Sequence, residues 1–271
     1  MSRKFQKPIK AYANKEFLES KQARGLRILS EYVEPQARFE QYRVDDTIVF
    51  MGSARLMARD TAEAALREAE ETGGDVERAR RDLEMSRYYE DARGLACKLT
   101  LWSKNLDEDD RRFVVCTGGG PGIMEAANRG ASEAKGVNVG LSISLPFEQH
   151  ENPYVTRELG FEFHYFFMRK FWFTYPAKAI VFFPGGFGTL DELFEMLTLL
   201  QTRKIRKHMP IVLYGSDFWR SVVNFETLVR HGTISAEDLD LMMITDSVDE
   251  AYNHITRELT DYALEIPGAT L

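Results

Sequence analysis

The chain has 271 residues, of which 44% are hydrophobic and 28% are charged. A chain of this size can bury a sizeable core as one domain, although its length alone leaves two domains open. The net charge of −7 at pH 7 disfavours sequence-independent binding of nucleic acid, because such binding depends on neutralising phosphates with lysine and arginine. Any anion that the protein binds is therefore expected to be small and held locally.

The first residues, Met1 to Lys15, are basic and polar and lack the apolar centre of a secretion signal. No stretch approaches the roughly 18 apolar residues that span a bilayer. We therefore expect a soluble, cytoplasmic protein that binds neither membranes nor nucleic acid. The two cysteines, Cys97 and Cys116, predict neither a disulfide framework nor a metal site, and the five histidines form no metal motif. Cys116 lies in an apolar run and is expected in the core.

Residues 14–42 carry apolar side chains among many charges, with Pro35 as a break. This pattern predicts an N-terminal helical extension over residues 1–45 that serves packing or dimerisation, followed by a second unit over residues 46–271. From Asp60 to Ser103 the chain is charged and helical, and it is interrupted at 73–75, where glycine ends one helix and Asp75 caps the next.

Three buried strands are each followed by glycines. The first, residues 47–51, leads into Gly52, Ser53 and Arg55, which are candidate contacts to phosphate or ribose or else form a simple turn. The second, residues 112–117, leads into a glycine turn that contains Gly119 and Gly120. Such a turn is typical of nucleotide binding or of close packing between strand and helix.

Two further features follow these turns. Glu125 is on the helix after the second turn and faces either a pocket or solvent. After a strand at 137–144, an aromatic run leads into Met168, Arg169 and Lys170 on a short helix. The adjacent cations are candidates to meet a bound anion, or they form a surface pair.

The third strand, residues 179–183, precedes the sequence Pro-Gly-Gly-Phe-Gly-Thr-Leu-Asp-Glu at 184–192. Glycines let the backbone approach an anion, and the first turn of the following helix offers unpaired N–H groups and a positive dipole end. The residues expected to bind the substrate here are Gly185, Gly186, Gly188 and Thr189. Thr189 and Glu192 also fit a capping box, in which the glutamate only satisfies an N–H group.

Strands at 210–214 and 241–245 alternate with helices at 217–229 and 247–264. The alternation over the whole chain predicts an α/β fold with a doubly wound, mostly parallel sheet and helices on both faces. Ligands bind such sheets beyond the carboxyl ends of the strands, where all three glycine turns fall.

The turn at 118–125, the Arg169–Lys170 pair and the motif at 184–192 together resemble the Lonely Guy family. The family motif Pro-Gly-Gly-x-Gly-Thr-x-x-Glu is matched at every fixed position, and the similarity covers most of the chain beyond the N-terminal extension. The resemblance implies a Rossmann-like nucleotide-binding catalytic domain, a homodimer or larger homo-oligomer, and hydrolysis of a nucleoside 5′-monophosphate to free base and ribose 5-phosphate.

The resemblance also implies roles for single residues. The family's catalytic arginine falls on Arg169, its neighbouring lysine on Lys170 and its catalytic glutamate on Glu192. Residues 166–168 read Phe-Phe-Met where many smaller members read Met-His-Glu, so the preferred base, AMP-like or cytokinin-like, stays open. The implied reaction needs no cofactor and no metal. Members were often labelled lysine decarboxylases, but no lysine here has a recognisable pyridoxal-phosphate context.

Cleavage of a ribosyl bond builds positive charge on the sugar, so a fixed carboxylate beside the ribose stabilises the transition state. A glutamate in the first helical turn is expected to stay ionised through the helix dipole, which suits Glu192 as a base rather than an acid. A protein that only senses or carries a nucleotide is the alternative, because similar glycine turns also serve to hold ligands. Release of free base from nucleoside monophosphates distinguishes the two.

Overall fold

A computed structural model describes residues 8–106, 111–145 and 151–268. The part of the N-terminal extension predicted for residues 1–7 lies outside these ranges. The described residues form one seven-stranded sheet in the order β4-β3-β2-β1-β5-β6-β7, and every strand pairing in it is parallel. The strands are β1 (Thr47–Met51), β2 (Val114–Thr117), β3 (Asn138–Ile143), β4 (Gly160–Phe163), β5 (Ala177–Phe182), β6 (Ile211–Tyr214) and β7 (Met242–Thr245). This Rossmann-like, doubly wound α/β fold confirms the predicted fold class.

The strand order reverses between β1 and β5. From β1 the chain winds outward to β4, and it then returns to β5 on the other side of β1. A crevice opens at such a switch point, outside the carboxyl ends of the two strands. The first and third glycine turns follow β1 and β5, so the topology alone brings them together.

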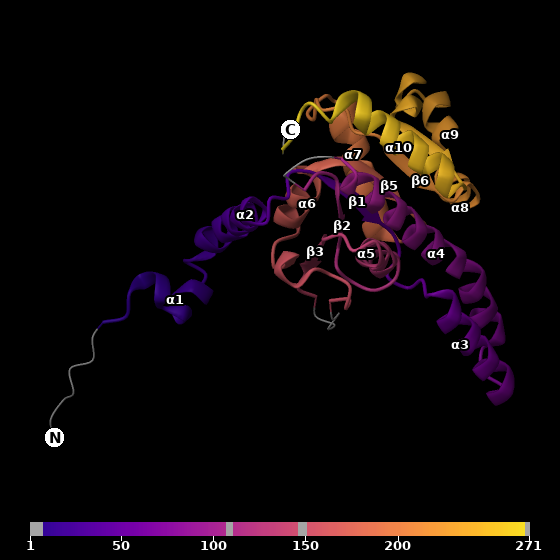
Figure 1. Cartoon of the computed structure of the whole chain (residues 1–271), viewed down its shortest axis with the longest axis horizontal. Coiled ribbons are helices and arrows are strands. Elements are labelled where there is room, and N and C mark those ends of the chain that lie inside the picture. Colours follow the sequence, from indigo (N-terminus) through magenta and orange to yellow (C-terminus); the bar gives the residue numbers. More distant parts are fainter. Residues whose placement is uncertain (1–7, 107–110, 146–150, 269–271) are drawn as a thin grey trace.

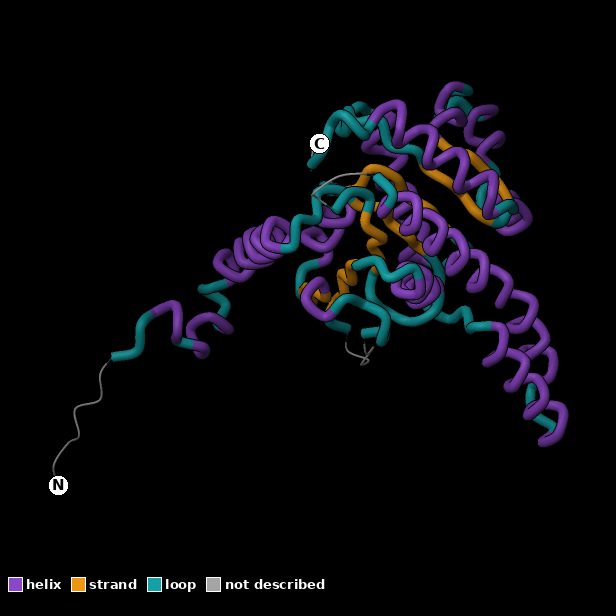
Figure 2. The backbone as a smooth tube through the Cα atoms, in the orientation of Figure 1, coloured by secondary structure: helices purple, strands orange, loops and turns teal. Residues whose placement is uncertain are grey.

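Helices cover both faces of the sheet (Figures 1 and 2). Successive side chains of a strand point to opposite faces, so Ile48 and Phe50 of β1 join one buried cluster while Val49 and Met51 join the other. The first face carries α4 (Val76–Lys104), α5 (Ile123–Glu133) and α10 (Val248–Tyr262). The second carries α6 (Phe166–Thr174), α7 (Phe187–Gln201), α8 (Ser216–Val222) and α9 (Phe225–Arg230). Short 3-10 helices span Ala11–Ala13, Arg157–Leu159 and Glu237–Leu241.

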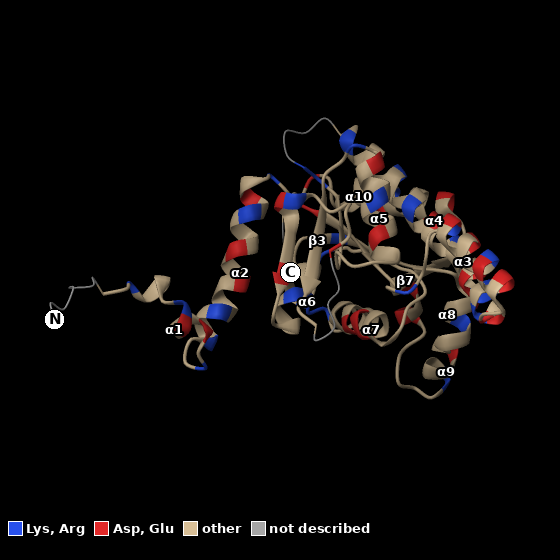
Figure 3. Ribbon diagram, turned by 90° about the horizontal axis from the view of Figure 1, so that it is seen from below, with Lys and Arg blue, Asp and Glu red and all other residues tan. Residues whose placement is uncertain are grey.

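Helix α3 (Arg59–Thr72) lies beside α4, and both carry many charged side chains (Figure 3). Gly73 ends α3 in the left-handed conformation, and the side chain of Asp75 accepts a hydrogen bond from the Arg78 N–H at the start of α4. Both helix signals read from the sequence are confirmed. The helix predicted at 217–229 is instead two helices, because the side chain of Asn224 caps the start of α9.

The helices α1 (Lys15–Glu19) and α2 (Arg24–Gln41) form an arm that extends from the body (Figure 1). The predicted break at Pro35 is wrong, because α2 continues through it. Proline cannot donate a hydrogen bond to the carbonyl four residues earlier, which here belongs to Glu31. The indole N–H of Trp172 on α6 donates to that carbonyl at 2.9 Å instead. A contact with the body therefore satisfies the group that the proline leaves without its helical partner.

Among the described residues, no helix combines the length and the apolar character that crossing a membrane requires. Cys116 is fully buried, as expected for a core residue.

Candidate functional site

A cavity of about 580 Å³ lies beyond the carboxyl ends of β1 and β5, at the switch point. It is bounded by the loop after β1, the turn after β2, and the helices α5, α6 and α7. The predicted site residues that line it are Gly52, Ser53, Arg55, Arg169, Gly186, Gly188, Thr189 and Glu192. The fold thus brings the proposed catalytic pair and parts of two glycine turns to one cavity.

The backbone of Ser53 joins the three glycine turns. Its N–H donates to the carbonyl of Pro184 at 3.0 Å, and its carbonyl accepts from the N–H of Ile123 at 3.1 Å. Gly122 makes the second contact possible: its φ is +72°, and a Cβ there would lie 2.2 Å from the Ser53 carbonyl oxygen. Only glycine fits this approach without a shift of the backbone.

Helix α7 begins at Phe187, with Gly186 as its N-cap and no side chain capping it. Thr189 is therefore the third helical residue, buried to 6% exposure, and cannot serve as an N-cap. The capping-box interpretation of Thr189 and Glu192 is wrong for this reason. Glu192 lies in the second turn of α7 and not in the first, further from the positive end of the helix dipole than the sequence predicted.

Arg169 on α6 and Glu192 on α7 face each other, with Nη2 of the arginine 3.5 Å from Oε1 of the glutamate. Their side chains are only 15% and 13% exposed. Burial raises the pKa of Glu192 to about 7, although the positive charge of Arg169 opposes the shift. Glu192 is therefore poised between its neutral and ionised forms near neutral pH, which corrects the expectation that the dipole keeps it ionised.

The guanidinium group of Arg169 lies between aromatic side chains. Its guanidinium carbon lies 5.3 Å from the ring centre of Phe166 and 5.5 Å from that of Phe173. Burial lowers the pKa of Arg169, while the charge of Glu192 raises it. The Nε atom of Arg169 is buried and makes no hydrogen bond in the described part of the chain. A ligand that accepts hydrogen bonds would meet an under-satisfied donor here.

Two neighbours of Arg169 do not line this cavity. Lys170 points to the outer side of α7, where its ammonium lies 2.7 Å from a carboxylate oxygen of Asp191 and 2.8 Å from one of Glu195. Met168 is 7% exposed and packs in the core of the second face. The substrate-binding roles predicted for both residues stay predictions.

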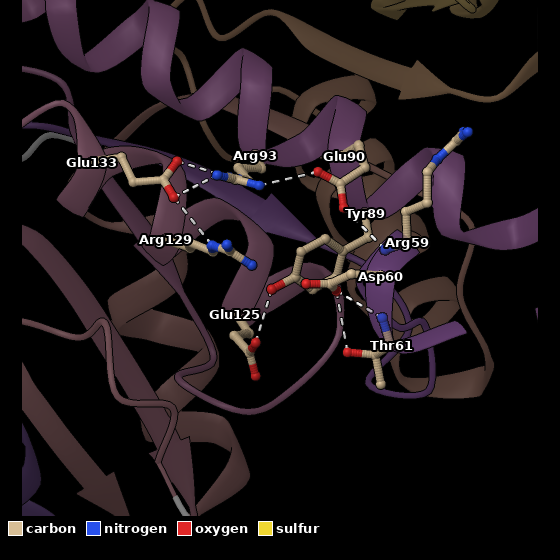
Figure 4. Close-up of polar contacts among 9 residues, drawn as sticks. All are labelled: Arg59, Asp60, Thr61, Tyr89, Glu90, Arg93, Glu125, Arg129 and Glu133. Carbon is tan, nitrogen blue, oxygen red and sulfur yellow. Dashed lines mark hydrogen bonds and ion pairs between the residues drawn. The ribbon is translucent and has the colours of Figure 1, made fainter. Parts of the chain in front are cut away.

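The second glycine turn contributes fewer residues to the cavity lining than the sequence indicated. The carbonyls of Gly119 and Gly120 accept hydrogen bonds from Asn152, and both glycines are buried outside the cavity lining. Glu125 accepts a hydrogen bond from the Tyr89 hydroxyl at 2.8 Å, which ties α5 to α4 (Figure 4). Gly185 lies behind Thr189, since a Cβ there would meet its hydroxyl oxygen at 2.2 Å.

Sequence reasoning missed several lining residues. Phe187, within the motif itself, is 93% exposed at the cavity. Phe173 lies four residues after Arg169 on α6, so helical spacing places both on one face and could have identified it. The residues added by the structure are Met51, Ala54, Gly118, Met124, Phe173, Phe187 and Leu190.

Comparison with known proteins yields a family model, described as "Possible lysine decarboxylase", that matches residues 124–255. A curated relative from Escherichia coli (strain K12), named pyrimidine/purine nucleotide 5′-monophosphate nucleosidase, is 29% identical over 150 residues. The match covers 47% of this chain and 32% of the relative, so the chain spans about a third of that protein's length.

Among solved structures, the molybdenum cofactor carrier protein from Chlamydomonas reinhardtii is 16% identical with a TM-score of 0.47, covering 79% of this chain and 99% of that one. The molybdenum cofactor binding protein from Rippkaea orientalis is 17% identical with a TM-score of 0.46, covering 78% and 96%. Likenesses at this level assign no function. The region that the family model matches, 124–255, contains Arg169, Glu192 and the whole glycine motif at 184–192, so the comparison agrees with the resemblance of this chain to the Lonely Guy family.

Proposed function

We propose that the protein is an N-glycosidase that hydrolyses a nucleoside 5′-monophosphate to the free base and ribose 5-phosphate. The observation that carries the proposal is the buried Arg169–Glu192 pair beside the amino end of α7, in one cavity at the switch point. The name of the partly matching Escherichia coli relative supports the same reaction class. The substrate's base, AMP-like or cytokinin-like, belongs to the proposal.

In the proposed reaction, the amino end of α7 binds the phosphate. The N–H groups of Gly188 and Thr189 lie in the first turn of α7, where backbone donors have no helical acceptor and the dipole is positive. Binding the phosphate there would fix the attached ribose toward the second turn of the same helix, which carries Glu192. Positioning of this kind lowers a barrier by several kcal/mol.

Glu192 would act on the water. The bond between C1′ of the ribose and the base nitrogen breaks, the water oxygen bonds to C1′, and one water proton ends on the departing base. A carboxyl group with a pKa of about 7 can accept a proton from water at neutral pH and then pass it on. In its ionised form it also stabilises positive charge on the sugar. Arg169 would bind phosphate or assist the departing base through its available donors.

The test is to incubate the purified protein with a panel of nucleoside 5′-monophosphates and to quantify free base by chromatography. We expect base release from at least one nucleotide, and loss of release in Glu192→Gln with the fold retained. If no nucleotide is cleaved but one raises the melting temperature, the protein is a nucleotide sensor or carrier and the proposal fails. Near-normal turnover by Glu192→Gln would overturn the role of the carboxylate.

The proposal extends to organisation and location. We place the catalytic unit in residues 46–271 and a helical extension in residues 1–45, in a cytoplasmic homodimer or larger homo-oligomer. The arm formed by α1 and α2 exposes several apolar side chains, among them Leu26, Leu29 and Val33, which supports burial of the arm by a second copy. Light scattering of the full chain, compared with a Leu29→Glu variant, tests the assembly.

A further inference from the structure

A second cavity, of about 650 Å³, lies at the amino ends of the strands, whereas the candidate active site lies at their carboxyl ends. It is formed at the amino ends of β6 and β7, where Ile211 and Met242 begin the two strands. The loop after α7 and one side of α10 complete its walls. Its volume falls in the range that holds small-molecule ligands.

Three cations line this cavity: Arg203, Arg206 and Lys207. Within the residues that the structure describes, none of them makes an ion pair with a carboxylate. Two carboxylates also belong to the lining, Asp240 and Glu258. The second of these is already held by other groups, since His208 lies 2.7 Å and Arg257 3.1 Å from its oxygens.

The balance of charge in the cavity is therefore positive. Once Glu258 is discounted, the carboxylate of Asp240 faces the two arginines, Arg203 and Arg206, together with the amine of Lys207. Cations grouped around a cavity favour a ligand with a multiply charged anionic group, because one such group can accept hydrogen bonds from several of them. A phosphate monoester carries three acceptor oxygens and close to two charges at neutral pH, which fits this arrangement.

The floor of the cavity is apolar. Ile205, Met209 and Ile211 line it and are each less than 5% exposed, and the half-buried Met242 lies beside them. Methionine side chains adapt their shape to apolar ligands. A purely inorganic anion would leave this surface unused. The lining therefore matches a ligand that joins an anionic group to an apolar body.

Lys207 lies where the charged rim meets the protein interior. Its ammonium group donates to the carbonyls of Thr174 and Tyr175, at 2.7 and 2.8 Å, where α6 ends. Burial, together with the charge of Lys178, lowers the pKa of Lys207 to about 7. A bound anion would favour the protonated form of Lys207, which would then be the third cation, beside Arg203 and Arg206, that contacts the ligand.

We propose that this cavity is a separate binding site for an organic phosphate monoester. The phosphate binds between Arg203, Arg206 and Lys207, and the apolar part of the ligand lies on Ile205, Met209 and Met242. The cavity is distinct from the candidate active site, with which it shares no lining residue.

The experiment is calorimetric titration of the full chain with 1-naphthyl phosphate as the probe. We expect saturable binding that weakens at least tenfold in the double variant Arg203→Ala/Arg206→Ala. Lys204→Ala is the matched control, because Lys204 is an exposed cation of the same loop outside the cavity lining; its effect should stay below twofold. Arg169→Ala should leave this binding unchanged, which separates the second cavity from the candidate active site.

Several outcomes would overturn the proposal. They are absence of saturation by about 10 mM probe, wild-type affinity in the double variant, and loss of binding in Arg169→Ala alone. Inorganic phosphate and 1-naphthol complete the test, and both should bind at least tenfold more weakly than the ester. Equal binding of inorganic phosphate would contradict the role of the apolar floor. Thermal unfolding of each variant confirms that it is folded.

Discussion

Nη2 of Arg169 lies 3.5 Å from Oε1 of Glu192, and the two side chains come from different helices on one face of the sheet. This distance is longer than the 2.7–2.9 Å typical of a strong charge-assisted hydrogen bond, so the contact is weak. Neither group is therefore fully neutralised by the other. A substrate that binds the arginine would find the carboxyl group close by and available.

Replacement of Glu192 by glutamine tests the chemistry. The amide keeps the size of the side chain but cannot accept a proton or carry negative charge, so base release should fall by about 10²–10⁴-fold. Binding of a nucleoside monophosphate, measured by calorimetry, should change little. Asp191→Asn is the control, because Asp191 directly precedes Glu192 and its carboxylate contacts Lys170 outside the cavity. Turnover of this variant should stay within about threefold of wild type.

The raised pKa of Glu192 has a consequence for stability. Between the ordinary pKa of a glutamate and about 7, the unfolded chain has lost the proton while the folded protein keeps it. The folded state then binds more protons, so its stability falls as pH rises through this window and levels off above about 7. Glutamine does not titrate, so Glu192→Gln lacks this loss of stability with rising pH.

We therefore expect the stability of Glu192→Gln, relative to wild type, to increase by about 2 kcal/mol between pH 5 and pH 8. Denaturant unfolding at the two pH values measures the difference. A relative stability that is independent of pH would show that Glu192 is not buried in a form with a raised pKa.

Two glycines offer a matched pair of substitutions. At Gly122 a Cβ would lie 2.2 Å from the Ser53 carbonyl oxygen and φ is +72°, so Gly122→Ala should cost about 2–3 kcal/mol or more. Gly94 lies within α4 and a Cβ there meets nothing within 4 Å, so Gly94→Ala should stabilise by about 0.5–1 kcal/mol. Chemical unfolding gives both values. Equal effects of the two substitutions would contradict the close approach at Gly122.

Glu31 on α2 provides a test of the arm. Its carboxylate accepts hydrogen bonds from the N–H groups of His164 and Tyr165, at 2.8 and 3.2 Å, at the start of α6. Glu31→Ala should destabilise the protein by about 1–2 kcal/mol, as loss of a helix cap does. Since α6 carries Arg169, turnover should fall as well. Calorimetry and initial rates measure the two effects.

Glu31→Gln keeps one acceptor and should give an intermediate loss in both measurements. Glu40→Ala, an exposed carboxylate on the same helix, is the control and should change stability by less than about 0.5 kcal/mol. If Glu31→Ala unfolds like wild type and keeps full turnover, α2 does not support the start of α6.

All the strands of the described sheet except β4, and the positions of the glycine turns, could be read from the sequence because their signals are local. Apolar runs ending in glycine predict a strand and a turn wherever they occur, and parallel pairing then places the turns at one edge. The pairing of Arg169 with Glu192 followed from a family resemblance. Nothing in their separation of 23 residues fixes it, since it depends on how α6 and α7 pack on the same face.

What the sequence could not predict depends on contacts between distant segments. The continuation of α2 through Pro35 requires the indole of Trp172, which is far away in the chain. The position of Lys170 outside the cavity is set by Asp191 and Glu195 on the next helix. The pKa of Glu192 likewise results from burial by several elements, whereas the sequence showed only its place in a helix.

The hydrogen bonds of Ser53 to Pro184 and Ile123 link loops that belong to three different strand-to-helix connections. Such loops, left separate, would each lose conformational freedom when a ligand ordered them. Here the protein has met that entropic cost during folding, so the cavity is preorganised before any ligand arrives. Binding should then cause little rearrangement of these three backbones, and selectivity among ligands depends on side chains such as Phe187 at the rim.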